Sequence, residues 1–68
     1  MAEETIFVKE ATSEHSIQQI EYLLNELAGI ERVLIDTEDG EVKVQYDDKR
    51  ISKERIILTI HQHNFHTS

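Results

Sequence analysis

The 68-residue sequence contains no cysteine and no proline, and it has only two glycines. Without cysteine there can be no disulfide, no thiolate catalysis, and no zinc or iron–sulfur site built on thiolates. The scarcity of proline and glycine argues against linkers and disordered tails, so we expect one domain over residues 1–68. The apolar runs, such as 33–35 and 56–58, are too short to span a bilayer, and the acidic start is unlike a signal peptide. The expected location is therefore cytoplasmic.

Basic residues are also scarce, because fourteen Asp and Glu residues stand against seven Lys and Arg, which gives a formal net charge of −7. A surface of this sign repels phosphate, so we expect neither nucleic-acid binding nor insertion into an anionic membrane. The electrostatically favoured partner is a basic protein surface or a cation.

Hydrophobic periodicity divides the chain into strands and helices. Segments with β-branched and alternating apolar residues predict strands, whereas apolar residues spaced by three and four predict amphipathic helices. The expected elements are a strand at 5–9, a helix at 14–28, strands at 30–36 and 41–47, a helix at 53–63 and a strand stub at 65–68.

Capping residues support these boundaries and lead to a fold. Ser13 and Ser52 are expected N-caps, while Gly29 and Asn64 are expected to take the left-handed conformation that ends each helix. Right-handed crossovers then place both helices on one face of an antiparallel sheet with strand order 4-1-3-2. The prediction is an α+β, ferredoxin-like βαββα(β) sandwich whose last strand is short or missing, which leaves the first strand with a partly unpaired edge. The expected core is Ile6, Val8, Ile17, Ile20, Leu24, Leu27, Val33, Ile35, Val42, Val44, Ile56 and Ile60.

The stretch around the first loop resembles the heavy-metal-associated domain family, which includes small copper chaperones and modules of copper-transporting ATPases. The family's signature is G-M-T-C-x-x-C, then an apolar residue and, further on, I-E-x-x-L. This chain has Ala11-Thr12-Ser13-Glu14-His15-Ser16-Ile17, followed by Ile20-Glu21 and Leu24. The resemblance continues through the 27–30 turn and the later strands and helix, and it implies the same ferredoxin-like fold.

Ser13 and Ser16 stand at the two cysteine positions of that signature, while Glu10 and Ala11 replace its glycine and methionine. A serine hydroxyl offers no anion near neutral pH, and oxygen is a poor ligand for soft Cu(I). The resemblance therefore implies a degenerate thiolate site that does not transfer Cu(I) by the family's mechanism.

Four histidines, His15, His61, His63 and His66, are the remaining candidate ligands. The fold would bring the first loop and the end of the second helix to one end of the sheet, so some of these rings could bind Zn(II), Cu(II) or Ni(II) weakly. The alternative is that they are solvent-facing residues at a helix terminus, where a positive charge is favourable.

Two functions follow from these observations. The first is a copper-chaperone-like protein with weak, histidine-based metal binding and no certain cofactor. The second is a metal-independent interaction module that docks another protein, such as a related metal-handling domain or ATPase, with the family's docking face. No arrangement of nucleophile, base and orienting acid is present in the sequence, so we expect no enzymatic activity.

Overall fold

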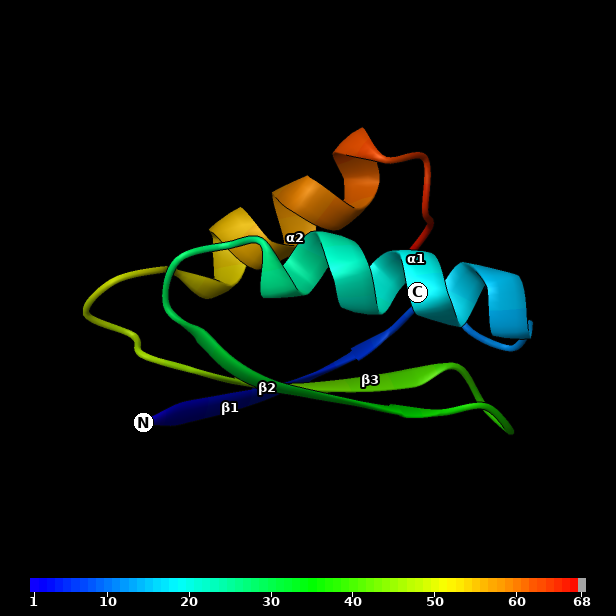
Figure 1. Cartoon of the computed structure of the whole chain (residues 1–68), viewed down its shortest axis with the longest axis horizontal. Helices are drawn as coiled ribbons and strands as arrows, with labels where there is room; N and C mark the ends of the chain where they lie inside the picture. Colours follow the sequence, from blue (N-terminus) through cyan, green and yellow to red (C-terminus); the bar gives the residue numbers. More distant parts are fainter. Residues whose placement is uncertain (68) are drawn as a thin grey trace.

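The protein, in a computed structural model that describes residues 1–67, has two layers. Figure 1 shows a three-stranded sheet on one side and two helices packed on the other. The elements in chain order are β1 (Ala2–Phe7), α1 (Glu14–Asn25), β2 (Ile30–Asp36), β3 (Glu41–Tyr46) and α2 (Lys53–Gln62). This is the predicted ferredoxin-like arrangement, without a full fourth strand in the described residues.

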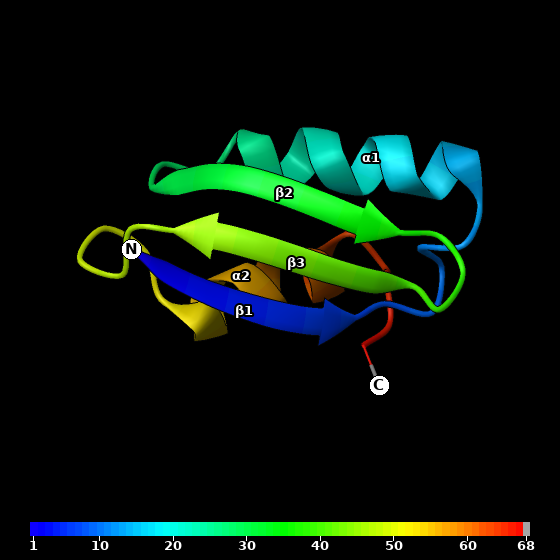
Figure 2. The ribbon, with the colours of Figure 1, turned by 90° about the horizontal axis from the view of Figure 1, so that it is seen from below.

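The sheet is antiparallel, and β3 lies between β1 and β2 (Figure 2). The β1 pairing runs from Ala2 opposite Tyr46 to Phe7 opposite Glu41, so β1 begins earlier and ends earlier than the predicted strand at 5–9. The acidic residues in the first half of β1 have poor strand propensity. They form a strand because they are hydrogen-bonded along the whole of β3, which their propensity alone does not predict.

Both helices begin at the predicted serines. Ser13 and Ser52 have extended backbone conformations, and their hydroxyls accept hydrogen bonds from the backbone N–H groups of Ser16 and Arg55. At the other end of α2, Asn64 has a φ of +64°. The Asn64 N–H donates to the His61 carbonyl and the Phe65 N–H to the Ile60 carbonyl, which completes a Schellman motif.

The end of α1 differs from the prediction. The helix stops at Asn25, a turn before Gly29, and the Leu27 N–H closes this end with a bond to the Leu24 carbonyl. Gly29, at φ +96°, instead turns the chain into β2, where a Cβ atom would lie 2.9 Å from Cγ2 of Ile51. A close approach between two loops therefore explains this glycine, and helix termination does not.

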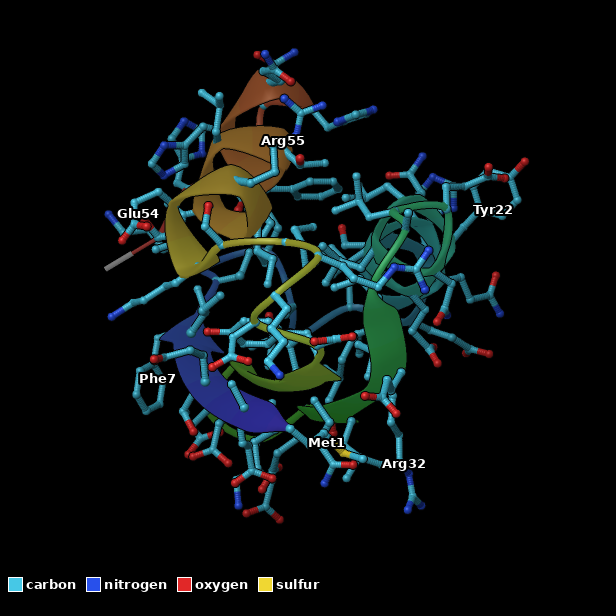
Figure 3. The ribbon with its side chains drawn as sticks, turned by 90° about the vertical axis from the view of Figure 1, so that its left-hand side faces the viewer. Met1, Phe7, Tyr22, Arg32, Glu54 and Arg55 are labelled. Carbon is cyan, nitrogen blue, oxygen red and sulfur yellow. The ribbon has the colours of Figure 1, made fainter. Side chains whose placement is uncertain are left out.

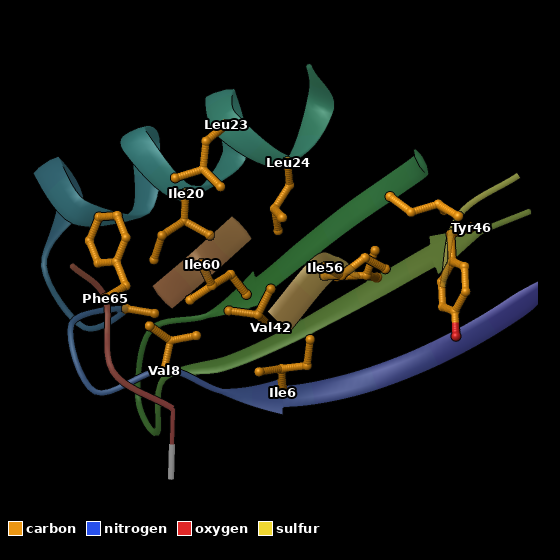
Figure 4. Packing of buried hydrophobic residues seen from close by; sticks show 13 residues of the cluster. Ile6, Val8, Ile20, Leu23, Leu24, Val42, Tyr46, Ile56, Ile60 and Phe65 are labelled. Carbon is orange, nitrogen blue, oxygen red and sulfur yellow. The ribbon is translucent and has the colours of Figure 1, made fainter. Parts of the chain in front are cut away.

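The core fills the space between the sheet and the helices (Figure 4). Most of the predicted core is buried, but four of its members are only partly buried: Ile17, Leu27, Val33 and Ile35. Val33 and Ile35 lie on β2, an edge strand of the three-stranded sheet, which leaves their outer side less well covered. The buried side chains absent from the predicted core are those of Ala11, Leu23, Tyr46, Ile51, Thr59 and Phe65.

The fourth strand is reduced to one bridge between Val8 and Thr67, next to a bond from the Lys9 N–H to the His66 carbonyl. Ser68, the last residue of the predicted stub, lies outside the described residues. Since the Lys9 N–H points away from β3 and backbone groups alternate along a strand, the N–H groups of Thr5 and Glu3 point to the same outer edge. Within residues 1–67, no partner strand pairs with this part of the edge, as predicted.

Candidate functional site

Backbone hydrogen bonds and a buried side chain, and not the serine hydroxyls, anchor the first loop, residues 8–13. The Val8 N–H donates to the Gly40 carbonyl at 2.9 Å, and the Ala11 N–H donates to the Val8 carbonyl at 3.0 Å. Ala11 is fully buried in the core. Gly40, at φ +72°, lies so close that a Cβ atom there would be 2.5 Å from the Val8 oxygen. The β2–β3 hairpin and the core therefore fix where the loop begins and how it turns.

Ser13 is exposed and Ser16 is half-buried at the start of α1. The Ser16 N–H donates to the Ser13 hydroxyl over 3.4 Å, a longer bond than the 3.1 Å of the equivalent cap at Ser52. Two neutral hydroxyls, one of them a helix cap, do not match the thiolate pair that a soft ion requires. The residues at this position therefore do not fit a Cu(I) site of the thiolate type.

Glu10 joins the first loop to the C-terminal segment. One carboxylate oxygen accepts from the His66 backbone N–H at 2.8 Å, and the other lies 2.7 Å from Nδ1 of the His66 ring. These hydrogen bonds, together with the charge on the imidazole when it is protonated, lower the pKa of Glu10 below 4.5. We call this pair the Glu10–His66 clamp.

The other histidines are divided between two places. Nδ1 of His63 lies 2.9 Å from the Thr59 carbonyl, and Nε2 of His61 lies 2.8 Å from the Thr67 hydroxyl. His15 is exposed on the first turn of α1. Among residues 1–67, no three or more His, Cys, Asp or Glu side chains are grouped so that they could hold a metal ion. The structure brings His15 and His63 to one groove, but it does not gather the four histidines into one site.

That groove runs between α1 and α2 and has a volume of about 700 Å³. Leu23, Leu27 and Phe65 provide its apolar lining, and Tyr22 is exposed beside it. Figure 3 shows Tyr22 on α1 and Arg55 on α2, both remote from the sheet. A hydrogen bond to Glu26 and the charge of that carboxylate raise the pKa of Tyr22. The remaining residues around the groove are His15, Gln18, Gln19, Glu26, Thr59, Gln62 and His63.

Sequence reasoning missed the clamp and the groove. The sequence identifies Glu10 only as a replacement for the signature glycine. No local pattern indicates that its partner is His66, 56 positions away. The groove had a weak signal in Tyr22, an aromatic residue beside the apolar stripe of its helix, and in Phe65 just beyond α2.

Comparison with known proteins identifies the class to which this fold and loop belong. The sequence model of the heavy-metal-associated domain matches residues 5–66, nearly the whole chain. The chain therefore belongs to the heavy-metal-associated domain family. Comparison with curated protein sequences gives no match. No helix among the described residues is long and apolar enough to cross a membrane.

Solved structures share the fold closely. A structure described as the CopZ metallochaperone superposes with a TM-score of 0.91 at 24% identity, and the match covers 98% of this chain and all of that one. A putative copper-ion-binding protein from Bacillus anthracis gives a TM-score of 0.86 at 26% identity, with 98% and 97% of the chains covered. A copper-binding domain from HMA7, a P-type ATPase, gives 0.91 at 18% identity, with 100% and 92% covered. The predicted likeness to copper chaperones is thus confirmed at the level of fold.

Proposed function

We propose that this chain is a cytoplasmic docking domain of the heavy-metal-associated family, which binds another protein through the groove between α1 and α2 and needs no thiolate-bound metal to do so. The observation that carries the proposal is the contrast at the first loop. Serines occupy both cysteine positions, yet backbone hydrogen bonds anchor the loop and an apolar groove lies beside it. The chain thus offers a surface that can bind a partner beside a loop that lacks the thiolates for a soft ion.

The groove has the composition of a protein-binding surface. Its apolar lining can accept side chains of a partner. Tyr22 is 69% exposed, so a partner that covers it would bury a large aromatic surface. Arg55 and Glu26 supply charges of both signs at its rim. Because the whole chain carries −7, the partner we propose is a related metal-handling domain with a basic face, such as a domain of a copper-transporting ATPase.

The test is an NMR titration of the isotope-labelled protein with a metal-free heavy-metal-associated domain of a copper-transporting ATPase, with EDTA present throughout. We expect shifts along the groove and an affinity that falls as salt is added. Tyr22→Ala should weaken binding by about fivefold or more, as expected for an aromatic contact in an interface. Glu26→Ala should weaken binding at low salt, because it removes an acidic group that would face the basic surface of the partner.

The matched control is Leu58→Ala, because Leu58 lies on α2 and is 47% exposed but does not line the groove. This variant should bind as the unaltered protein does. Shifts confined to the open face of the sheet, or equal losses in all three variants, would contradict the proposal.

The second candidate function is weak binding of Zn(II), Cu(II) or Ni(II) by histidine. It is favoured by one observation: the histidines lie in pairs, with His15 and His63 at the groove and His61 and His66 at a small pocket beyond α2. Two imidazoles suit these ions better than Cu(I) and bind less tightly than a full set of protein ligands.

A further inference from the structure

The small pocket beyond α2 has a volume of about 290 Å³ and is formed by the C-terminal segment of the described chain. Its lining residues are His61, Asn64, Phe65, His66 and Thr67. It lies at the carboxyl end of α2, where the helix dipole favours a positive charge. It therefore differs in position and in surroundings from the groove that holds His15 and His63.

The clamp fixes the orientation of the His66 ring. Both oxygens of Glu10 are directed at His66, one at its backbone N–H and the other at Nδ1 of its ring. In a neutral imidazole, the nitrogen that faces a carboxylate carries the proton, so Nε2 of His66 keeps its lone pair. A histidine whose other nitrogen donates to a carboxylate is the usual arrangement in metal sites, since it sets the tautomer and increases the basicity of the ligand.

His61 presents a second nitrogen to the same pocket. Its Nε2 lies 2.8 Å from the Thr67 hydroxyl, an exposed contact that a metal ion could replace. The pair at the groove is held less well: His63 is directed by a neutral carbonyl, and His15 is exposed on the first turn of α1. In the pair of His61 and His66, both rings are thus held by hydrogen bonds, which favours this pair as the one that binds a cation.

We propose that His61 and His66 bind one divalent transition-metal ion through their Nε2 atoms, with Glu10 as the positioning residue and water completing the coordination. The inference rests on the second candidate function and assigns it a location. With two protein ligands where structural sites use four, the site is a weak one. Ions that prefer imidazole, Zn(II), Cu(II) and Ni(II), are its chemical class.

The experiment is a titration of the full chain with Zn(II), followed by calorimetry and by the NMR signals of the histidine rings. We expect His61→Ala and His66→Ala each to weaken binding by at least about tenfold, and the double variant His15→Ala/His63→Ala to bind like the unaltered protein. The absence of cysteine removes any competing thiol.

The positioning role of Glu10 has its own readout. Long-range nitrogen–proton spectra of the metal-free protein should show His66 protonated at Nδ1, and Glu10→Gln should move it toward a mixture of tautomers while weakening Zn(II) binding by about tenfold. Protection of the Lys9 amide from hydrogen exchange, unchanged in that variant, would show that its bond to the His66 carbonyl and thus the C-terminal segment are still in place.

The outcomes separate the two proposals. This inference would be overturned if His15→Ala/His63→Ala abolished Zn(II) binding while His61→Ala and His66→Ala did not. Histidine-based binding as such would then still stand. No binding at millimolar Zn(II) would overturn both. Neither result bears on docking through the groove, because that test is run with EDTA.

Discussion

Replacing Leu24 by alanine should remove a large share of the stability of this domain. Leu24 lies on α1, and its fully buried side chain points from that helix into the core (Figure 4). Each buried methylene is worth ~0.8 kcal/mol, so the deleted carbons account for about 2–3 kcal/mol. The cavity left in a close-packed core raises the cost to about 3–5 kcal/mol. A domain of this length has a total stability of roughly 3–10 kcal/mol, so a large share would be lost.

The measurement is urea unfolding followed by circular dichroism. Leu58→Ala is the matched control, because it deletes the same atoms from a helix position that is 47% exposed, and it should cost less than about 1 kcal/mol. If Leu24→Ala does not fold, Leu24→Met keeps most of the volume and should cost less than about 1.5 kcal/mol. A cost below about 1 kcal/mol for Leu24→Ala, or an equal cost for both leucines, would refute the assigned helix face.

Three further predictions concern the first loop and the sheet edge. Changing both Ser13 and Ser16 to cysteine should create tight Cu(I) binding, which competition against a Cu(I) chelator would detect; an intact fold without binding would mean that the loop does not hold the family's ligand geometry. The pKa of Glu10 is lower in the folded protein than the ordinary value of 4.5. The stability that Glu10 contributes is therefore present above the unfolded-state pKa, and it is lost as the pH falls through the pKa of the folded protein. Urea midpoints of the unaltered protein should thus fall more steeply on acidification than those of Glu10→Gln, and parallel curves would argue against the clamp. Hydrogen exchange should find the Ile6 amide protected, because it points to β3, and the Thr5 amide unprotected, because it lies at the open edge. Equal protection of both amides would show that another strand covers this edge.

Most element boundaries were predictable because they depend on residues close together in sequence. The second strand was predicted at 30–36 and is observed at Ile30–Asp36. Ser52 and Asn64 bound α2 as their side chains and backbone preferences suggest. Gly29 misled the prediction, since the same left-handed conformation serves a helix end and a turn against Ile51, and only the packed structure distinguishes them.

The candidate site was less predictable, for a physical reason. The positions of Ser13 and Ser16 follow from a motif, and the structure places them at the start of α1 as expected. The partner of Glu10 is set by where the C-terminal segment passes the first loop, which hydrophobic periodicity does not encode. Whether two histidines face one pocket depends on side-chain direction at a helix terminus, so only the folded structure divides the four rings into pairs.

The anchoring of the first loop has a consequence for how such a protein can change over generations. The backbone there is held by the Val8–Gly40 bond and by the buried Ala11, and neither group is at a ligand position. Substitutions at Ser16 therefore leave these anchors in place, and at Ser13 the folding cost is limited to the cap of α1. The same separation works in reverse: because residues with another task fix the loop backbone, a new pair of ligands could be introduced by few substitutions, and the double-cysteine variant tests whether the fixed backbone suits them.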